Sequence, residues 1–402
     1  MSKKLLKNLY AVFLAGFMAL LLLPQSAQAQ EKEAYVVKSS DNKTLTFYYD
    51  DQKSSRTGTV WGIEETREVG YYGQTFPAWS GTRDTPESKV TTAVFDASFK
   101  NYLPQSTEDW FLYLIKLEKI EGLTNLNTSK VTTMSGMFAG CQNLTSLNLS
   151  NLNTENVQDM SSMFYDCNNL TSLDLSNFNT ENVQDMTYMF YGCHNLTSLN
   201  LSNFKTENVQ KMWSMFEGCQ NLTSLNLSNF NIENVYDMSK MFSGCQNLTS
   251  LDLSNFKTKN VQNMWRMFYG CKSLTSLNLS NFNTENVKDM SEMFYECNSL
   301  QTIYCNNTWT YSHSRSWDMF QGCTSLQGAV PYDESKTDAS MANPETGYFT
   351  KKESTGVATA TTEANANIQA IYSTDGRRLN ELQRGLNIVR MSNGTTQKIL
   401  RK

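Results

Sequence analysis

Residues 168–193 read NNLTSLDLSNFNTENVQDMTYMFYGC, and this stretch decides the fold because close copies of it follow one another along the chain. A cysteine closes each copy, so that cysteines recur every 26 residues. These residues are Cys141, Cys167, Cys193, Cys219, Cys245, Cys271, Cys297 and Cys323. A fixed period of this length indicates a solenoid, in which units stack because no single unit can bury its own apolar side chains.

Each unit contains two apolar patterns. The first is L-x-x-L-x-L, which predicts a short strand, and in the first full copy it comprises Leu144, Leu147 and Leu149. The second has apolar residues at i, i+3, i+4 and i+7, which predict one face of a short helix. In the same copy these are Met160, Met163, Phe164 and Cys167. The expected fold class is therefore α/β, a leucine-rich repeat solenoid with parallel strands on one face and short helices on the other.

The motif L-T-S-L-N-L-S-N-F-N-T-E-N-V, followed by D-M-S-S-M-F-Y-x-C, resembles the repeat of the BspA-like leucine-rich repeat family of bacterial surface proteins. The resemblance spans about residues 120–323. It implies display on a bacterial surface and adhesion to host extracellular matrix proteins, host cell-surface proteins or other cells. The usual leucine-rich consensus has asparagine at the position of Phe178, whereas Asn177 stands one residue earlier here, so an asparagine ladder is expected at a displaced position.

The N-terminus has the layout of a secretory signal peptide over residues 1–29. Three lysines precede an apolar stretch over residues 9–23, and the small-residue motif Ala27-Gln28-Ala29 follows it. This stretch is shorter than the roughly 20 apolar residues that a transmembrane helix needs. We therefore expect a secreted protein on the bacterial cell surface, outside the outer membrane, with no transmembrane segment in the mature chain.

The composition predicts four further regions. Residues 30–106 are aromatic and strand-like and predict an N-terminal β cap, residues 107–350 form the repeats with degenerate capping units, and residues 351–367 resemble a linker. Residues 368–402 carry seven Lys or Arg against two acids, and Asp375-Gly376 and Asn393-Gly394 are hairpin signals. This tail resembles the end of a type IX secretion sorting domain; an ordinary basic β tail is the alternative.

Charge and residue content disfavour several classes of function. The net charge of -5 lacks the basic character of nucleic-acid or anionic-membrane binding. With two histidines in 402 residues and no recognisable nucleophile–base spacing, we expect no enzyme and no cofactor. The cysteines lack C-x-x-C spacing or histidine partners, which argues against a metal site. Their parallel placement favours a reduced core ladder over disulfides, which the secreted location would permit.

Two surfaces are candidate binding sites. On the helix side and its edges, Trp213, Trp265 and Tyr236 interrupt small or polar positions, and exposed aromatic residues are typical of protein-binding hot spots. The strand face is small and polar and includes Asp174 and Asp252, so it could hold a glycan through many weak contacts. A passive spacer without a dedicated site is the third hypothesis.

Overall fold

A computed structural model describes residues 31–69, 73–311, 314–351, 368–374, 376–391 and 396–401. The predicted signal peptide, nearly all of the predicted linker, and Asp375 and Asn393-Gly394 of the predicted hairpin turns lie outside these residues. The chain divides into two compact units, residues 1–350 and 351–402.

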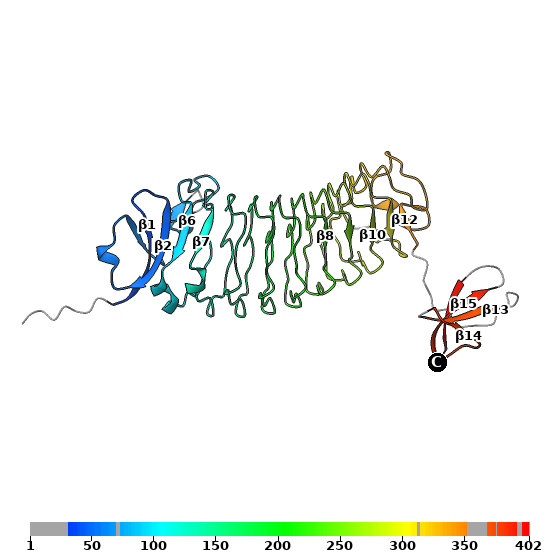
Figure 1. Ribbon diagram of the computed structural model, residues 1–402. Helices are drawn as coiled ribbons and strands as arrows, with labels where there is room; N and C mark the ends of the chain where they lie inside the picture. Colours follow the sequence, from blue (N-terminus) through cyan, green and yellow to red (C-terminus); the bar gives the residue numbers. More distant parts are fainter. Residues whose placement is uncertain are drawn as a thin grey trace, which may run out of the picture. The chain divides into compact units, whose positions relative to one another are not determined.

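The first unit begins with a five-stranded sheet in the order β3-β1-β2-β6-β7 (Figure 1). Strand β1 pairs antiparallel with β2 and β3, whereas β2, β6 and β7 pair in parallel, so the sheet changes from a hairpin to the parallel arrangement of the repeats. The strands are β1 (Glu33–Lys38), β2 (Thr44–Asp50), β3 (Thr59–Gly62), β6 (Thr92–Phe95) and β7 (Lys119–Glu121), with a separate hairpin of β4 (Thr66–Val69) and β5 (Gln74–Pro77). This sheet extends beyond residue 106, the expected end of the cap.

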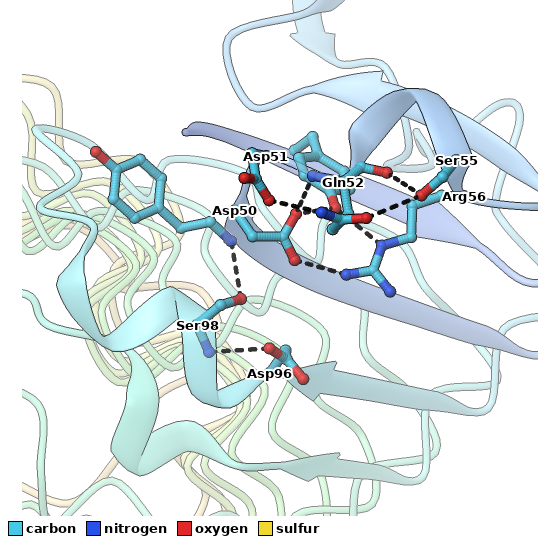
Figure 2. A network of polar contacts seen from close by, with 9 residues as sticks. Asp50, Asp51, Gln52, Ser55, Arg56, Asp96 and Ser98 are labelled. Atoms are coloured by element: carbon cyan, nitrogen blue, oxygen red, sulfur yellow. Dashed lines mark hydrogen bonds and ion pairs between the residues drawn. The ribbon is translucent and has the colours of Figure 1, made fainter. Parts of the chain in front are cut away.

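Polar side chains fasten the end of β2 to the two short 3-10 helices beside it (Figure 2). The Asp50 carboxylate pairs with the Arg56 guanidinium at 2.6 Å and accepts the backbone N–H of Gln52 at 2.9 Å. These contacts enclose η1 (Lys53–Ser55). Asp96 caps η2 (Ala97–Asn101) by accepting the N–H of Ser98, whose hydroxyl accepts the N–H of Tyr49 at 3.1 Å. The cap is therefore a folded body whose loops are held by charge-assisted hydrogen bonds.

The prediction of a short helix in each repeat is wrong. The described residues contain no α-helix, only the 3-10 segments η1, η2, η3 (Leu123–Asn125) and η4 (Ala339–Met341). Residues 160–167 instead form consecutive β-turns, with left-handed φ angles of 55° at Ser162 and 51° at Asp166. We call this segment, and its equivalent in each repeat, the turn chain. Met160, Met163, Phe164 and Cys167 are all fully buried, so the apolar pattern identified the inward side chains but not the backbone.

Hydrogen bonds between repeats explain the turn chain. The N–H groups of alternate residues in it donate to carbonyls of the next repeat at 2.7–3.0 Å; the donors are Met160, Ser162, Phe164 and Asp166. The N–H groups of Met163, Tyr165 and Cys167 close turns onto carbonyls three residues back at 3.0–3.3 Å. A helix would direct all of these groups along its own axis and leave the neighbouring repeat without backbone partners. Stacking therefore selects turns over helix.

Parallel pairing at an offset of one repeat is present, as expected, but the strands are short. β8 (Ser224–Leu225) pairs with β9 (Ser250–Leu251), and β10 (Ser276–Asn278), β11 (Thr302–Tyr304) and β12 (Phe349–Thr350) form a second parallel sheet. A second ladder, which the sequence did not indicate, consists of single bridges such as Asp159↔Asp185 and Asp185↔Lys211. The first unit is thus rich in sheet-like pairing, with repeats lying side by side (Figure 1).

Buried side chains repeat in register with the backbone. In the turn chains one phenylalanine per repeat stacks on the next, as Phe190 does on Phe216 with ring centroids 5.7 Å apart and planes inclined by 4°. The stack starts at Phe111, which also contacts Phe47 of β2 at 5.7 Å. The cap and the repeats therefore share one continuous apolar core.

Asparagine and threonine side chains join the repeats at a second level. The expected asparagine ladder is present at the displaced position: the Asn177 amide donates to the carbonyls of Leu149 and Leu152 at 3.0 and 2.9 Å. Threonines form a further ladder, in which the Thr206 hydroxyl donates to the Asn231 carbonyl and accepts the Asn231 N–H, both at 2.8 Å. Ile232 stands at the threonine position of its own repeat and supplies no hydroxyl.

We predict that Thr206→Val will lower the free energy of unfolding by about 1–3 kcal/mol, because the nearly isosteric change leaves the N–H and the carbonyl of Asn231 without their buried partner. Urea denaturation monitored by circular dichroism measures the change. Ile232→Val is the matched control, since it removes one methylene at a position that makes no such bonds and should cost about 0.5–1.5 kcal/mol. Equal losses of stability from Thr206→Val and Ile232→Val would contradict the role of the hydroxyl.

The second unit is an antiparallel sheet in the order β14-β13-β15-β16. Its strands are β13 (Ile368–Ser373), β14 (Arg378–Leu379), β15 (Gly385–Met391) and β16 (Thr396–Arg401). Asn387 is buried in it, and its amide donates to the carbonyls of Gln383 and Gly385 while accepting the Gln383 N–H. The tail is thus β-structured, as its sequence indicates.

Candidate functional site

One position of the turn chain alternates in the later repeats between small residues, of which Thr187, Ser239 and Ser291 are buried, and tryptophans that are partly exposed. It directly follows the first buried methionine of the turn chain, except in the last repeat, where Ser316 replaces that methionine. In chain order its residues are Ser161, Thr187, Trp213, Ser239, Trp265, Ser291 and Trp317. Trp213 and Trp265 are half-buried, and Trp317 is 52% exposed. We call Trp213, Trp265 and Trp317 the tryptophan row. Sequence reasoning missed Trp317, although Trp317 and Trp265 are separated in sequence by two repeats, as Trp265 and Trp213 are.

Trp213 lies against a cluster of tyrosines from the two preceding repeats. Its ring meets Tyr188 edge-on with centroids 4.2 Å apart, and Tyr188 meets Tyr191 at 5.5 Å. Tyr191 in turn stacks on Tyr165 at 4.6 Å. Such contacts restrict the rotation of the rings, so that an interface formed here would lose little side-chain freedom on binding.

Two cations lie near the ring of Trp265. The Lys240 ammonium lies 5.1 Å and the Arg266 guanidinium 4.8 Å from the ring centroid, within the range of cation–π attraction. Lys240 also pairs with Glu217 at 3.3 Å, and Arg266 forms a two-pronged pair with Glu292 at 2.9 and 3.0 Å. The positive charges around Trp265 are therefore balanced within the chain, and the ring is the feature that this area offers to a partner.

Tyr236 lies apart from the tryptophan row. It occupies a position that is glutamine in most other full repeats, is 40% exposed, and lines a groove of about 500 Å³. The other lining residues are Asn234, Asn260, Gln262, Asn286 and Lys288. A second groove of about 270 Å³ is lined by the equivalent asparagines and glutamines of the preceding repeats. Trp213 and Trp265 are not among the lining residues of either groove, so Tyr236 belongs to a different surface feature from the tryptophan row.

The two aspartates predicted on the strand face are not brought together. Asp174 and Asp252 are both exposed and lie three repeats apart. Each carboxylate accepts a nearby backbone N–H, from Ser176 at 3.0 Å and from Ser254 at 2.9 Å. The side-chain and backbone hydrogen bonds from Ser176 lower the pKa of Asp174. Both aspartates therefore stabilise the turn that follows them directly in the chain, at residues 176–177 and 254–255.

The repeat cysteines are buried and make the same contact in each unit. The Cys219 thiol donates to the carbonyl of Phe190 at 3.1 Å, and the Cys193 thiol to that of Phe164 at 3.2 Å. No disulfide joins them in the described part of the chain. Within the same residues there is no group of three or more His, Cys, Asp or Glu that could hold a metal. Burial raises the pKa of Cys193 and of Cys245 to about 12.

An acidic pocket that no sequence pattern predicts lies where the cap meets the first repeat. It measures about 250 Å³ and its lining includes Glu64, Glu65, Glu108 and Asp109. Burial, followed by the neighbouring Glu108 charge, raises the pKa of Asp109 to about 7. Its carboxylate lies directly over the Cα of Gly136, where a side chain would collide with it.

Comparison with individual known proteins does not establish a shared fold. No curated protein matches the chain at a significant level. The solved structure titled "Crystal structure of TLR13-ssRNA13 complex" is similar at 19% identity over 59% of this chain and 35% of that one, with a TM-score of 0.25. A TM-score this low does not establish a shared fold, and the chain spans about a third of that protein's length.

Among the described residues, no helix has the length and apolar character needed to cross a membrane.

The family profile described as "Mycoplasma protein of unknown function, DUF285" matches twice, over residues 108–225 and residues 214–332. The two matches overlap and together cover more than half of the chain. The chain therefore belongs to this repeat family.

Proposed function

We propose that this chain is a secreted leucine-rich repeat solenoid that is displayed on a bacterial surface and binds another protein through the tryptophan row, without enzymatic activity. Secretion is supported by the signal-peptide layout of residues 1–29 and by the resemblance of residues 368–402 to a sorting domain. The resemblance of the repeats to BspA-like proteins points to host extracellular matrix or cell-surface proteins as the partner class.

The tryptophan row is the observation that carries this proposal. Neighbouring repeats hold serine or threonine at the same position, so the stack does not need a large side chain there. Indole rings that remain partly exposed on a rigid scaffold have the character of hot-spot residues. The rings of Trp213 and Trp265 are also held in place by their neighbours, which lowers the entropic cost of binding.

The charges around the row indicate what kind of surface would fit it. Lys240 and Arg266 are already paired with Glu217 and Glu292 within the chain. A strongly anionic partner would have to compete with these carboxylates. An apolar or aromatic protein surface would instead bury the rings without breaking the ion pairs, and it is the partner chemistry that we propose.

The double variant Trp213→Ser/Trp265→Ser tests the proposal, because it introduces the residue that other repeats already hold. Its affinity for immobilised extracellular matrix proteins, measured by surface plasmon resonance on a panel of purified proteins, should fall at least about tenfold, since one hot-spot ring contributes about 2 kcal/mol. Ser239→Ala, at the same position of the intervening repeat, is the matched control and should bind as the parent does.

Thermal denaturation shows whether the double variant remains folded. If it is folded and binds as tightly as the parent, the row does not bind the partner. Failure of the parent to bind any protein on the panel would contradict the matrix-protein class.

A further inference from the structure

The grooves beside Tyr236 form a surface that the proposed function does not use. The smaller groove, of about 270 Å³, is lined by Gln158, Gln184 and Gln210 together with Asn182 and Asn208. The larger groove, of about 500 Å³, continues in the next three repeats, where Tyr236, Gln262 and Lys288 occupy the glutamine position. The two grooves therefore lie in the same two columns of side chains and together span six consecutive repeats.

The asparagine column is held rigidly. The amide of Asn208 donates to the carbonyl of Glu181 at 2.8 Å, and that of Asn234 to the carbonyl of Glu207 at 2.7 Å. Each bond joins an asparagine to the preceding repeat and fixes the plane of its amide. Because these side chains are already ordered, a ligand that contacts them would not have to immobilise them.

The glutamine column is built on a continuous backbone ladder. The N–H of Gln210 donates to the carbonyl of Gln184 at 2.9 Å, and the N–H of Gln262 to that of Tyr236 at 2.8 Å. These backbone groups are thus occupied, so an extended peptide could not add to them as a further strand. A ligand in the groove must be recognised by the side chains.

The chemistry of the side chains is neutral. The linings contain no acid, and their one cation, Lys288, donates to the Gln262 amide oxygen at 2.8 Å. Primary amides both donate and accept hydrogen bonds, which matches hydroxyl groups, since these also do both. The exposed ring of Tyr236 adds a flat apolar surface with a polar end, suited to the C–H face of a sugar ring.

The spacing of the columns also fits a sugar polymer. Paired backbones lie about 4.8 Å apart, which is close to the length of one sugar residue in an extended chain. Successive amide pairs could therefore contact successive sugars. Each contact would be weak, but their binding free energies would add up to a considerable affinity. We propose that the groove binds an extended neutral oligosaccharide, with Tyr236 as the stacking platform and the flanking asparagines and glutamines as hydrogen-bonding partners.

Isothermal titration calorimetry with the full chain tests this site. The probes are cellohexaose and N-acetylchitohexaose as neutral hexasaccharides, their trisaccharides, and hexagalacturonate as an anionic contrast. At least one neutral hexasaccharide should bind, and its trisaccharide should bind at least about tenfold more weakly because fewer repeats are engaged. Absence of binding by both neutral hexasaccharides, or tighter binding of hexagalacturonate, would overturn the proposal.

Variants of Tyr236 locate the site. Tyr236→Gln introduces the residue of the neighbouring repeats and should weaken hexasaccharide binding at least about tenfold with an unchanged melting temperature, whereas Tyr236→Phe should retain it, since the ring remains. The double variant Trp213→Ser/Trp265→Ser is the control on the other surface and should bind the sugar as the parent does. Unchanged affinity of a folded Tyr236→Gln chain would show that the ring is not the platform.

Discussion

Above about pH 9 the free energy of unfolding of the repeats should fall steeply, by about 1.4 kcal/mol per pH unit for each buried thiol. Burial raises the pKa of Cys193 and Cys245 to about 12, and it raises the pKa of Cys219 as well. In the unfolded chain a thiol has a pKa of about 8.5. The stability contributed by the neutral buried thiol is therefore complete below that value and is lost as the pH rises toward the folded pKa.

A series of urea denaturations from pH 7 up to the highest pH at which the parent still folds measures this effect. Tyrosines also ionise in this range, and the variant Cys193→Ala separates the contribution of one thiol from theirs. At neutral pH the variant should be less stable than the parent by about 1–2 kcal/mol, because a small cavity replaces the sulfur. Above about pH 9 the difference should shrink by about 1.4 kcal/mol per pH unit and then change sign. Parallel pH profiles for parent and variant would show that this thiol is not buried in a neutral state.

Phe216→Ala should lower the free energy of unfolding by about 3–5 kcal/mol, the usual range for a large aromatic side chain removed from a packed core. Phe216 is fully buried between Phe190 and Phe242, with ring centroids 5.7 and 5.8 Å away. Each repeat contacts chiefly its neighbours, so a cavity here weakens the interfaces on both of its sides. Urea denaturation gives the loss, and hydrogen exchange should show reduced protection on both sides of residue 216.

Phe216→Leu is the matched control, because leucine fills most of the space and should cost about 1–2 kcal/mol. The thiol of Cys245 donates to the Phe216 backbone carbonyl, so that bond survives in both variants. If alanine and leucine destabilise equally, ring packing is not what holds the repeats together at this level. If protection is lost only within the altered repeat, the stacked repeats do not unfold cooperatively around it.

The candidate surfaces were only partly readable from the sequence. Trp213 and Trp265 are conspicuous because they replace small residues in nearly identical repeats. Trp317 was missed because its repeat is degenerate and its alignment depends on the following Met319 and Phe320. The groove around Tyr236 was not predicted, since an amide column becomes a groove wall only when the repeats are stacked and the intervening valines, such as Val235, turn inward.

The sequence by itself determined which side chains are buried, because a strict period forces each copy to place its leucines, methionines, phenylalanine and cysteine alike. It did not determine the backbone of residues 160–167, where an apolar pattern of helical spacing forms a chain of β-turns. Local periodicity describes only the direction of side chains, and both conformations bury Met160 and Phe164. The tertiary structure decided between them, because a neighbouring repeat offers carbonyl groups to every second N–H, and only the turn chain can reach them.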